Sequence, residues 1–264
     1  MKQKVIFFGN GMLADYALAI IEKSCQIVFH AHSKEDLEEV IRIKQENPEV
    51  HGILASFGVM IPGRVLEVFE PEGILNVHPS LLPLYRGASP IESAILAGDS
   101  EFSVSVMKLV KAMDAGPVYY QTTLSNLPLS KREIYKALAE TGAEWIVNNL
   151  TDLPKPILQD NTKATFCGKL ERAMGALTPE TDSSEQTYRK IVAFQGFPKP
   201  KYAFFGLNCI ILEAHILEKG ETALLTIPCT DGREIAVDML QPEGRKAMDA
   251  KSFLNGYRKQ GLVT

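Results

Sequence analysis

Short apolar runs alternate with helical patterns over the first 150 residues, and this alternation constrains the fold most strongly. Strands are expected at 5–8, 27–29, 52–55, 74–77, 104–107 and 118–120, because each run is short and apolar. Helical patterns occupy 13–21, 35–45, 90–97 and 130–150. Strands that alternate with helices predict an α/β domain, in which a parallel or mixed sheet carries helices on both faces.

The pattern changes near residue 169, which indicates a second domain. The two prolines in 151–156 mark a candidate boundary. A helix at 183–194 is followed by strands at 202–205, 209–214, 222–228 and 234–239, and Asp249 can cap a final helix. This succession predicts a small β-barrel or open sheet. We therefore expect domains at 1–168, including the linker, and at 169–264.

The composition is that of an ordinary globular protein, with 45% hydrophobic and 23% charged residues. A formal net charge of −4 provides no overall basic field that would indicate a nucleic-acid partner, although a local patch would suffice. Four scattered cysteines without C-x-x-C spacing predict free thiols in a reducing compartment. The first strand begins at once and no long apolar run occurs, so we expect a cytoplasmic protein.

Residues 76–87 (NVHPSLLPLYRG) and the DAG sequence that begins at Asp114 together provide three kinds of reactive side chain. The Asn76 amide can donate to a developing oxyanion, the His78 imidazole can carry a proton, and the Asp114 carboxylate can orient the imidazole. Asn76 and His78 end a predicted strand, where open α/β sheets bind ligands. Because N-x-H is short and common, spacing alone also allows turn residues and a loop histidine.

Two loops near these residues admit two interpretations each. Residues 80–83 are apolar and stiffened by Pro79 and Pro83, so they suit one wall of a slot for a flat heteroaromatic ligand. They also suit a loop packed on the core. The backbone around Gly58, after the third strand, can hydrogen-bond a pterin-like edge or form a strand-to-helix turn.

Glycines 9 and 11 partly match the G-x-G-x-x-G/A dinucleotide motif. The motif requires an acidic residue at the end of the next strand, but that strand leads into His30 and His32. This favours a plain turn. The two histidines have no cluster of candidate partners, so no metal site is predicted.

Taken together, the residues at 76–87 and 114–116 resemble the folate-dependent formyltransferases. The family pattern is N-x-H-x-S-L-L-P-x-[YW]-R-G followed by a D-x-G loop, and the match continues through 88–91 and 97–99. The run at 241–248 (QPEGRKAM) is similar to the C-terminal sequence of members that act on methionyl-tRNA. The resemblance therefore extends to both domains.

The resemblance implies a Rossmann-like formyltransferase domain followed by an OB-like β-barrel. It implies formyl transfer from 10-formyltetrahydrofolate to the α-amine of methionyl-initiator tRNA, for translation initiation, by a monomer without a metal. Asn76 and His78 would stabilise the oxyanion, and Asp114 would help His78 to remove the amine proton. The expected folate-binding residues are Phe57, Gly58, Val59, Met60, Ser80, Leu81, Leu82 and Pro83.

Basic residues suggest where the acceptor RNA would bind, although residues 171–264 hold 12 basic and 12 acidic side chains. The charges fit either a solvated surface or a local groove for RNA phosphates. The expected tRNA-binding residues are Arg86, Arg189, Lys190, Lys199, Lys201, Arg245 and Lys246.

Two departures from the family pattern concern the backbone at residue 79 and the recognition of the acceptor. Pro79 replaces a small residue and requires φ near −65°. The tRNA-specific members also carry a long basic loop after the second strand, whereas residues 31–50 read as an acidic helix here.

Four alternative functions remain. The acceptor could be an amino sugar on a nucleotide, or it could be water, as in a formyltetrahydrofolate hydrolase. A non-catalytic RNA-binding module and an NAD-dependent oxidoreductase are readings from other classes.

Overall fold

The computed structural model describes residues 2–127 and 130–258, and the chain divides into two compact units. The first unit runs to Lys169 apart from Ile95–Gly98, and the second contains Ile95–Gly98 and the chain from Leu170 onward. Among the described residues, no helix has the length and apolar character needed to span a membrane.

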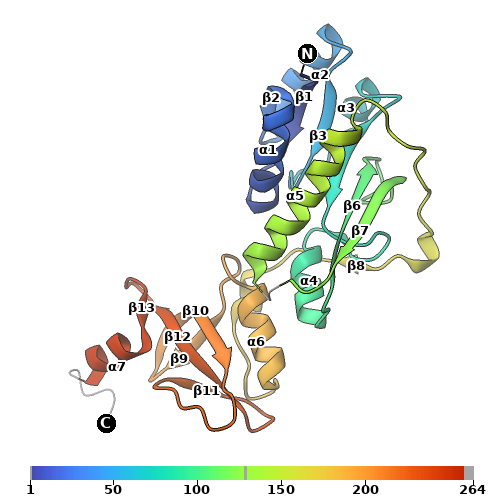
Figure 1. Ribbon diagram of the computed structural model, residues 1–264. Helices are drawn as coiled ribbons and strands as arrows, with labels where there is room; N and C mark the ends of the chain where they lie inside the picture. Colours follow the sequence, from blue (N-terminus) through green and yellow to red (C-terminus); the bar gives the residue numbers. More distant parts are fainter. Residues whose placement is uncertain (1, 128–129, 259–264) are drawn as a thin grey trace. The chain divides into compact units, whose positions relative to one another are not determined.

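The first unit is built on a six-stranded mixed sheet with the order β2-β1-β3-β4-β6-β7 (Figure 1). Strands β1 to β4 are parallel, and β6 and β7 run antiparallel to their neighbours. The strands are β1 (Lys4–Phe8), β2 (Gln26–Ala31), β3 (His51–Leu54), β4 (Ile74–His78), β6 (Phe102–Lys108) and β7 (Val118–Leu124). The predicted mixed sheet is confirmed.

Helices cover both faces of this sheet, as the alternating pattern predicts. Helices α1 (Met12–Ser24) and α5 (Lys131–Asn149) lie side by side, and Gly142 allows α5 to approach Val77 of β4 closely. A methyl group added at Gly142 would lie 2.7 Å from a Val77 methyl carbon. On the other face, α2 (Leu37–Glu46) and α3 (Gly63–Val68) share a buried apolar cluster with β1 and β3. Helix α4 spans Pro90–Ala97.

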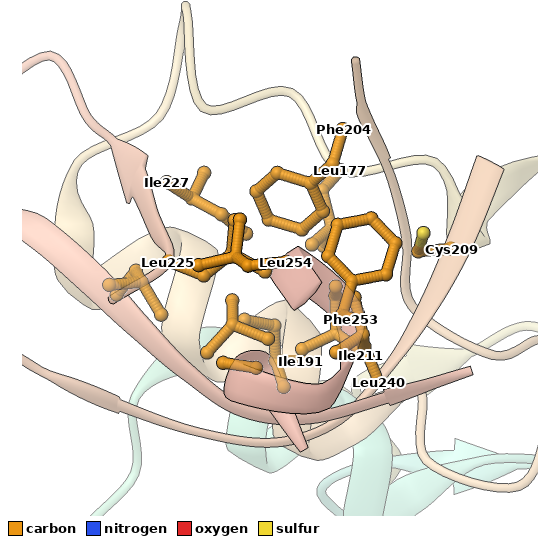
Figure 2. Close-up of a cluster of buried hydrophobic side chains, with 13 residues drawn as sticks. Leu177, Ile191, Phe204, Cys209, Ile211, Leu225, Ile227, Leu240, Phe253 and Leu254 are labelled. Atoms are coloured by element: carbon orange, nitrogen blue, oxygen red, sulfur yellow. The ribbon is translucent and has the colours of Figure 1, made fainter. Parts of the chain in front are cut away.

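The second unit is a curled antiparallel sheet, consistent with a small barrel-like domain, with the order β11-β12-β10-β9. Phe204, Ile211, Ile191 and Phe253 belong to its apolar core, which joins the strands to both helices (Figure 2). The elements are α6 (Ser184–Ala193), β9 (Lys201–Phe204), β10 (Leu207–Ile216), β11 (Thr226–Pro228), β12 (Glu234–Pro242), β13 (Met248–Asp249) and α7 (Ala250–Arg258). The predicted fold class is thereby confirmed.

Two local features show how closely the sequence patterns match the elements. The Asp249 carboxylate accepts a 2.7 Å hydrogen bond from the Ser252 amide, which confirms its role as the cap of α7. The strand expected at 222–228 is shorter than predicted and covers only Thr226–Pro228.

Candidate active site

Asn76 and His78 lie on β4, between β3 and β6, and both are 5% exposed. Because side chains two positions apart on a strand share a face, both project to the same side of the sheet. Within the described part of the chain, the Asn76 side chain has no hydrogen-bond partner, although its backbone is paired with Met107. The amide is therefore free to bind a substrate atom.

The His78 ring is held between a carbonyl and a carboxylate. Its Nε2 lies 3.1 Å from the Tyr85 carbonyl oxygen, and its Nδ1 lies 3.7 Å from Asp114 Oδ1. Because a carbonyl oxygen can only accept, Nε2 carries the proton in this contact. Nδ1, beside the carboxylate, is then the nitrogen that can take up a proton during a reaction.

Tyr85 is itself fixed, which fixes the carbonyl that accepts from His78. Its backbone N–H donates to Thr165 Oγ1 at 2.8 Å, and its hydroxyl donates to Asp99 at 2.9 Å. Burial and the hydrogen bond to Asp99 raise the pKa of Tyr85 to about 12. The hydroxyl therefore stays protonated and keeps its donor at neutral pH.

Asp114 is held with its backbone in the left-handed region, at a φ of 48°. Its Oδ2 accepts a 2.8 Å hydrogen bond from the Gly87 amide. Gly87 belongs to β5 (Arg86–Gly87), which pairs with β8 (Phe166–Cys167) so closely that a Cβ at Gly87 would lie 2.0 Å from the Cys167 carbonyl oxygen. The short β5–β8 ladder, which was not expected from the sequence, thus brings a backbone donor to Asp114.

The loop at 80–83 is fixed by two side chains of the sheet that sequence reasoning missed. Ser105 Oγ accepts from the Leu82 amide at 3.1 Å and donates to the Ser80 carbonyl at 2.6 Å. Gln121 Nε2 donates to the Leu82 carbonyl at 2.7 Å. Ser80 and Leu82 are buried, whereas Leu81 is exposed. These hydrogen bonds hold the backbone on both sides of the exposed Leu81 side chain, and Pro83 comes directly after the fixed segment.

The expected folate loop after β3 divides into a buried and an open part. Phe57 is 2% exposed and packs edge-on against Phe8, with ring centroids 5.7 Å apart. Its side chain belongs to the core, so Phe57 can offer a ligand only its backbone. Gly58 has a φ of 73°, Val59 is half-buried, and Met60 is 69% exposed.

The turn at Gly9 has a steric reason for its glycine. A Cβ at this position would lie 2.1 Å from the Ala55 carbonyl oxygen, and the Asn10 amide donates to the Ser56 carbonyl at 3.1 Å. The turn is thus packed against the chain that follows β3, which supports its interpretation as a plain structural turn.

The structure argues against a contact between Arg86 and RNA phosphates. Arg86 is 4% exposed, and its guanidinium donates to Gln159 Oε1 and Asn161 Oδ1. The sequence places Arg86 in the 76–87 motif, where it could be expected to be available to RNA. The side-chain oxygens that accept from it belong to residues more than 70 positions later in the chain.

The remaining expected RNA-binding cations lie in the second unit. Lys190 is occupied by Asp182, at 2.5 Å, and by Thr178, and Arg189 is half-buried. The exposed ones are Lys199, Lys201, Arg245 and Lys246. Lys201 also lines a cavity of about 520 Å³ together with Tyr202, Asn208 and Gln241.

Comparison with known families identifies both halves of the chain. Residues 13–150 match the model described as "Formyl transferase", and residues 169–258 match "Formyl transferase, C-terminal domain". The chain belongs to the formyl transferase family.

Curated relatives of this formyltransferase include two bacterial proteins named methionyl-tRNA formyltransferase. The protein from Dehalococcoides mccartyi (strain CBDB1) is 32% identical over 246 residues, covering 88% of this chain and 78% of the relative. The protein from Granulibacter bethesdensis is 34% identical over 221 residues, covering 78% and 68%.

Solved structures show the same fold at lower identity. The methionyl-tRNA formyltransferase from Clostridium thermocellum matches with a TM-score of 0.68 and 18% sequence identity. The match covers 92% of this chain and 99% of the Clostridium chain. HypX from Aquifex aeolicus, in complex with tetrahydrofolic acid, matches with a TM-score of 0.73 and 16% sequence identity. The match covers 97% of this chain and 47% of HypX. A sugar 3N-formyltransferase, WlaRD, matches with a TM-score of 0.65 and 16% sequence identity. The match covers 93% of this chain and 99% of WlaRD.

Proposed function

We propose that this formyltransferase moves a formyl group from 10-formyltetrahydrofolate to the α-amine of methionyl-initiator tRNA. It would act as a monomer in the cytoplasm, in translation initiation. The observation that carries the proposal is the pairing of half-buried Asp114 with buried His78, which lies on the strand that also carries the unpartnered amide of Asn76. The names of the curated relatives support methionyl-tRNA as the acceptor.

The chemistry follows from these three side chains. The amine nitrogen attacks the formyl carbon, and the electron pair of the C=O bond moves to the oxygen, where the Asn76 amide donates a hydrogen bond. His78 Nδ1 takes the proton from the amine, and the Asp114 carboxylate stabilises the imidazolium. Collapse of the intermediate breaks the bond to folate N10, which receives the proton from His78.

The folate slot would lie between the loops at 57–60 and 80–83. Leu81 and Met60 are exposed apolar side chains, and the Leu82 backbone is held rigid by Ser105 and Gln121. A stiff apolar wall with backbone polar groups suits a flat heteroaromatic ring system. Holding the two reactants in contact would supply much of the rate acceleration.

The acceptor RNA would be bound mainly by exposed cations of the second unit. Lys199, Lys201, Arg245 and Lys246 are exposed, whereas residues 31–50 contain three basic and six acidic side chains. That acidic segment is also the observation that favours the second candidate, a formyltransferase for an amino sugar on a nucleotide.

A direct test compares methionyl-initiator tRNA, an amino-sugar nucleotide and water as formyl acceptors. We expect rapid transfer to the tRNA that is lost in His78→Ala. Folate turnover without a tRNA product would refute the proposed acceptor and support one of the alternatives. Four phosphate contacts would give a slope of about −3 to −4 for log affinity against log salt, whereas a small acceptor would give a much shallower slope.

A further inference from the structure

Gln159 is half-buried and joins the loop of Asp114 to the arginine of β5. Its Nε2 donates to the carbonyl oxygens of Asp114, at 2.8 Å, and Gly116, at 2.7 Å. Its Oε1 accepts from Arg86 Nε at 3.0 Å and from Arg86 Nη2 at 2.6 Å. All four hydrogen-bonding positions of the side-chain amide are therefore used, which fixes its orientation.

Arg86 gives this junction a rigid base. The guanidinium is buried and also donates to Asn161 Oδ1 at 2.8 Å. Arg86 immediately precedes Gly87, whose amide binds the Asp114 carboxylate. The two residues of β5 thus hold Asp114 twice, its carboxylate through Gly87 and its backbone through Gln159.

The conformation of Asp114 needs such support. A φ of 48° is uncommon for a residue with a side chain, and such backbones persist where the surroundings over-determine them. Two residues later, a Cβ at Gly116 would lie 1.8 Å from the Lys108 carbonyl oxygen, so the loop is pressed against the end of β6. Loss of the two donors from Gln159 would let the loop move while leaving the sheet intact.

We propose that Gln159, anchored by Arg86, is a positioning residue that keeps the Asp114 carboxylate opposite His78 during catalysis. The proposal rests on the proposed role of the His78–Asp114 pair. Gln159 lies between the two family matches, which end at 150 and begin again at 169. Gln159 thus supports the loop of Asp114 from a position outside both family matches.

Two substitutions in the full-length protein test this role. Gln159→Met removes all four hydrogen bonds at similar volume, and Gln159→Glu keeps an acceptor for Arg86 but replaces the donors. We expect kcat to fall about tenfold to a hundredfold in both, because a displacement of about 1 Å at a reacting group can cost a hundredfold. The KM for folate should stay within about twofold, which is small on the same scale. Asp160→Ala is the matched control, since Asp160 caps the adjacent turn through Thr162 without contacting Asp114.

A double-mutant cycle separates positioning from a general structural effect. In an Asp114→Asn background, Gln159→Met should lower kcat by less than about twofold, because residues that act through one another are not additive. An undiminished loss in that background would overturn the proposal. If Gln159→Met does not fold, Gln159→Glu decides the same comparison.

Amide hydrogen exchange at Gly87 gives a readout that does not depend on the acceptor. We expect faster exchange of this amide in both Gln159 variants and unchanged exchange in Asp160→Ala. Wild-type protein that formylates no tRNA would refute the proposed function, while faster exchange would still support the tether. Active wild-type protein with unchanged kcat and unchanged Gly87 exchange in both variants would overturn the inference and leave the function standing.

Discussion

Replacing Asn76 by alanine tests the oxyanion donor with little disturbance of the fold. The side chain is nearly fully buried on β4, yet its amide makes no hydrogen bond to any residue that the structure describes. The strand keeps its backbone pairing with β3 and β6, because alanine preserves the same N–H and C=O groups. The substitution therefore removes a donor for the substrate without breaking an internal bond.

The expected magnitude follows from this environment. Removing one oxyanion donor costs about a hundredfold to a thousandfold in kcat, or about 2.7–4 kcal/mol. The effect on stability should be close to the ordinary value for a point substitution, about 1 kcal/mol. Activity should thus fall far more than stability, a combination that general unfolding does not produce.

Single-turnover formyl transfer with saturating folate measures the chemical step, and thermal unfolding measures the fold. Asn47→Ala is a suitable control, because the Asn47 side chain caps the end of α2 by donating to the Ile43 carbonyl. A loss of less than about threefold with an unchanged melting temperature would refute the donor role, since it is far below the scale of one such donor.

Two predictions concern stability. Lys131→Met should lower the free energy of unfolding by about 3–5 kcal/mol in urea titrations, because it leaves the buried Glu92 carboxylate without the ammonium 2.8 Å away. A loss below about 1 kcal/mol would contradict this. Hydrogen bonds from Ser184 are the main cause that lowers the pKa of Asp231 to about 2. This stabilisation is complete above the ordinary value near 3.8 and is lost as pH falls toward 2, so Asp231→Asn should lack that part of acid denaturation. Identical acid profiles would refute it.

Regular elements could be predicted because burial repeats along them. The helix expected at 183–194 is observed as Ser184–Ala193, and Ser183 caps it by accepting from the Gln186 amide at 3.3 Å. Helix α4 was expected at 90–97 and spans Pro90–Ala97, since proline suits the first turn. In each case the determining interactions lie within a few residues of one another.

The supports of the candidate site could not be predicted in this way. Each strand of the β5–β8 ladder has two residues, too few to show an alternating pattern, and the partners lie 80 residues apart. Ser105, Gln121 and Gln159 are ordinary polar residues whose roles depend on which backbone groups the fold brings to them. A sequence shows which side chains can donate, but it does not show where unsatisfied carbonyls will meet them.

The partners of each cation in the folded protein also determine which cations are available to bind RNA. Residues 31–50 look unsuited to RNA by charge count alone, and the structure strengthens this conclusion. Arg42 is bound to Glu39 and Glu46, and the Lys44 ammonium donates to the Val50 carbonyl at 2.8 Å. Cations that are already bound to acidic side chains or backbone carbonyls displace few counterions from the phosphates of RNA, so they add little to its binding affinity. If tRNA is the acceptor, its phosphates must therefore be neutralised mainly by exposed cations elsewhere, and Lys199, Lys201, Arg245 and Lys246 of the second unit are the exposed cations that the sequence indicates.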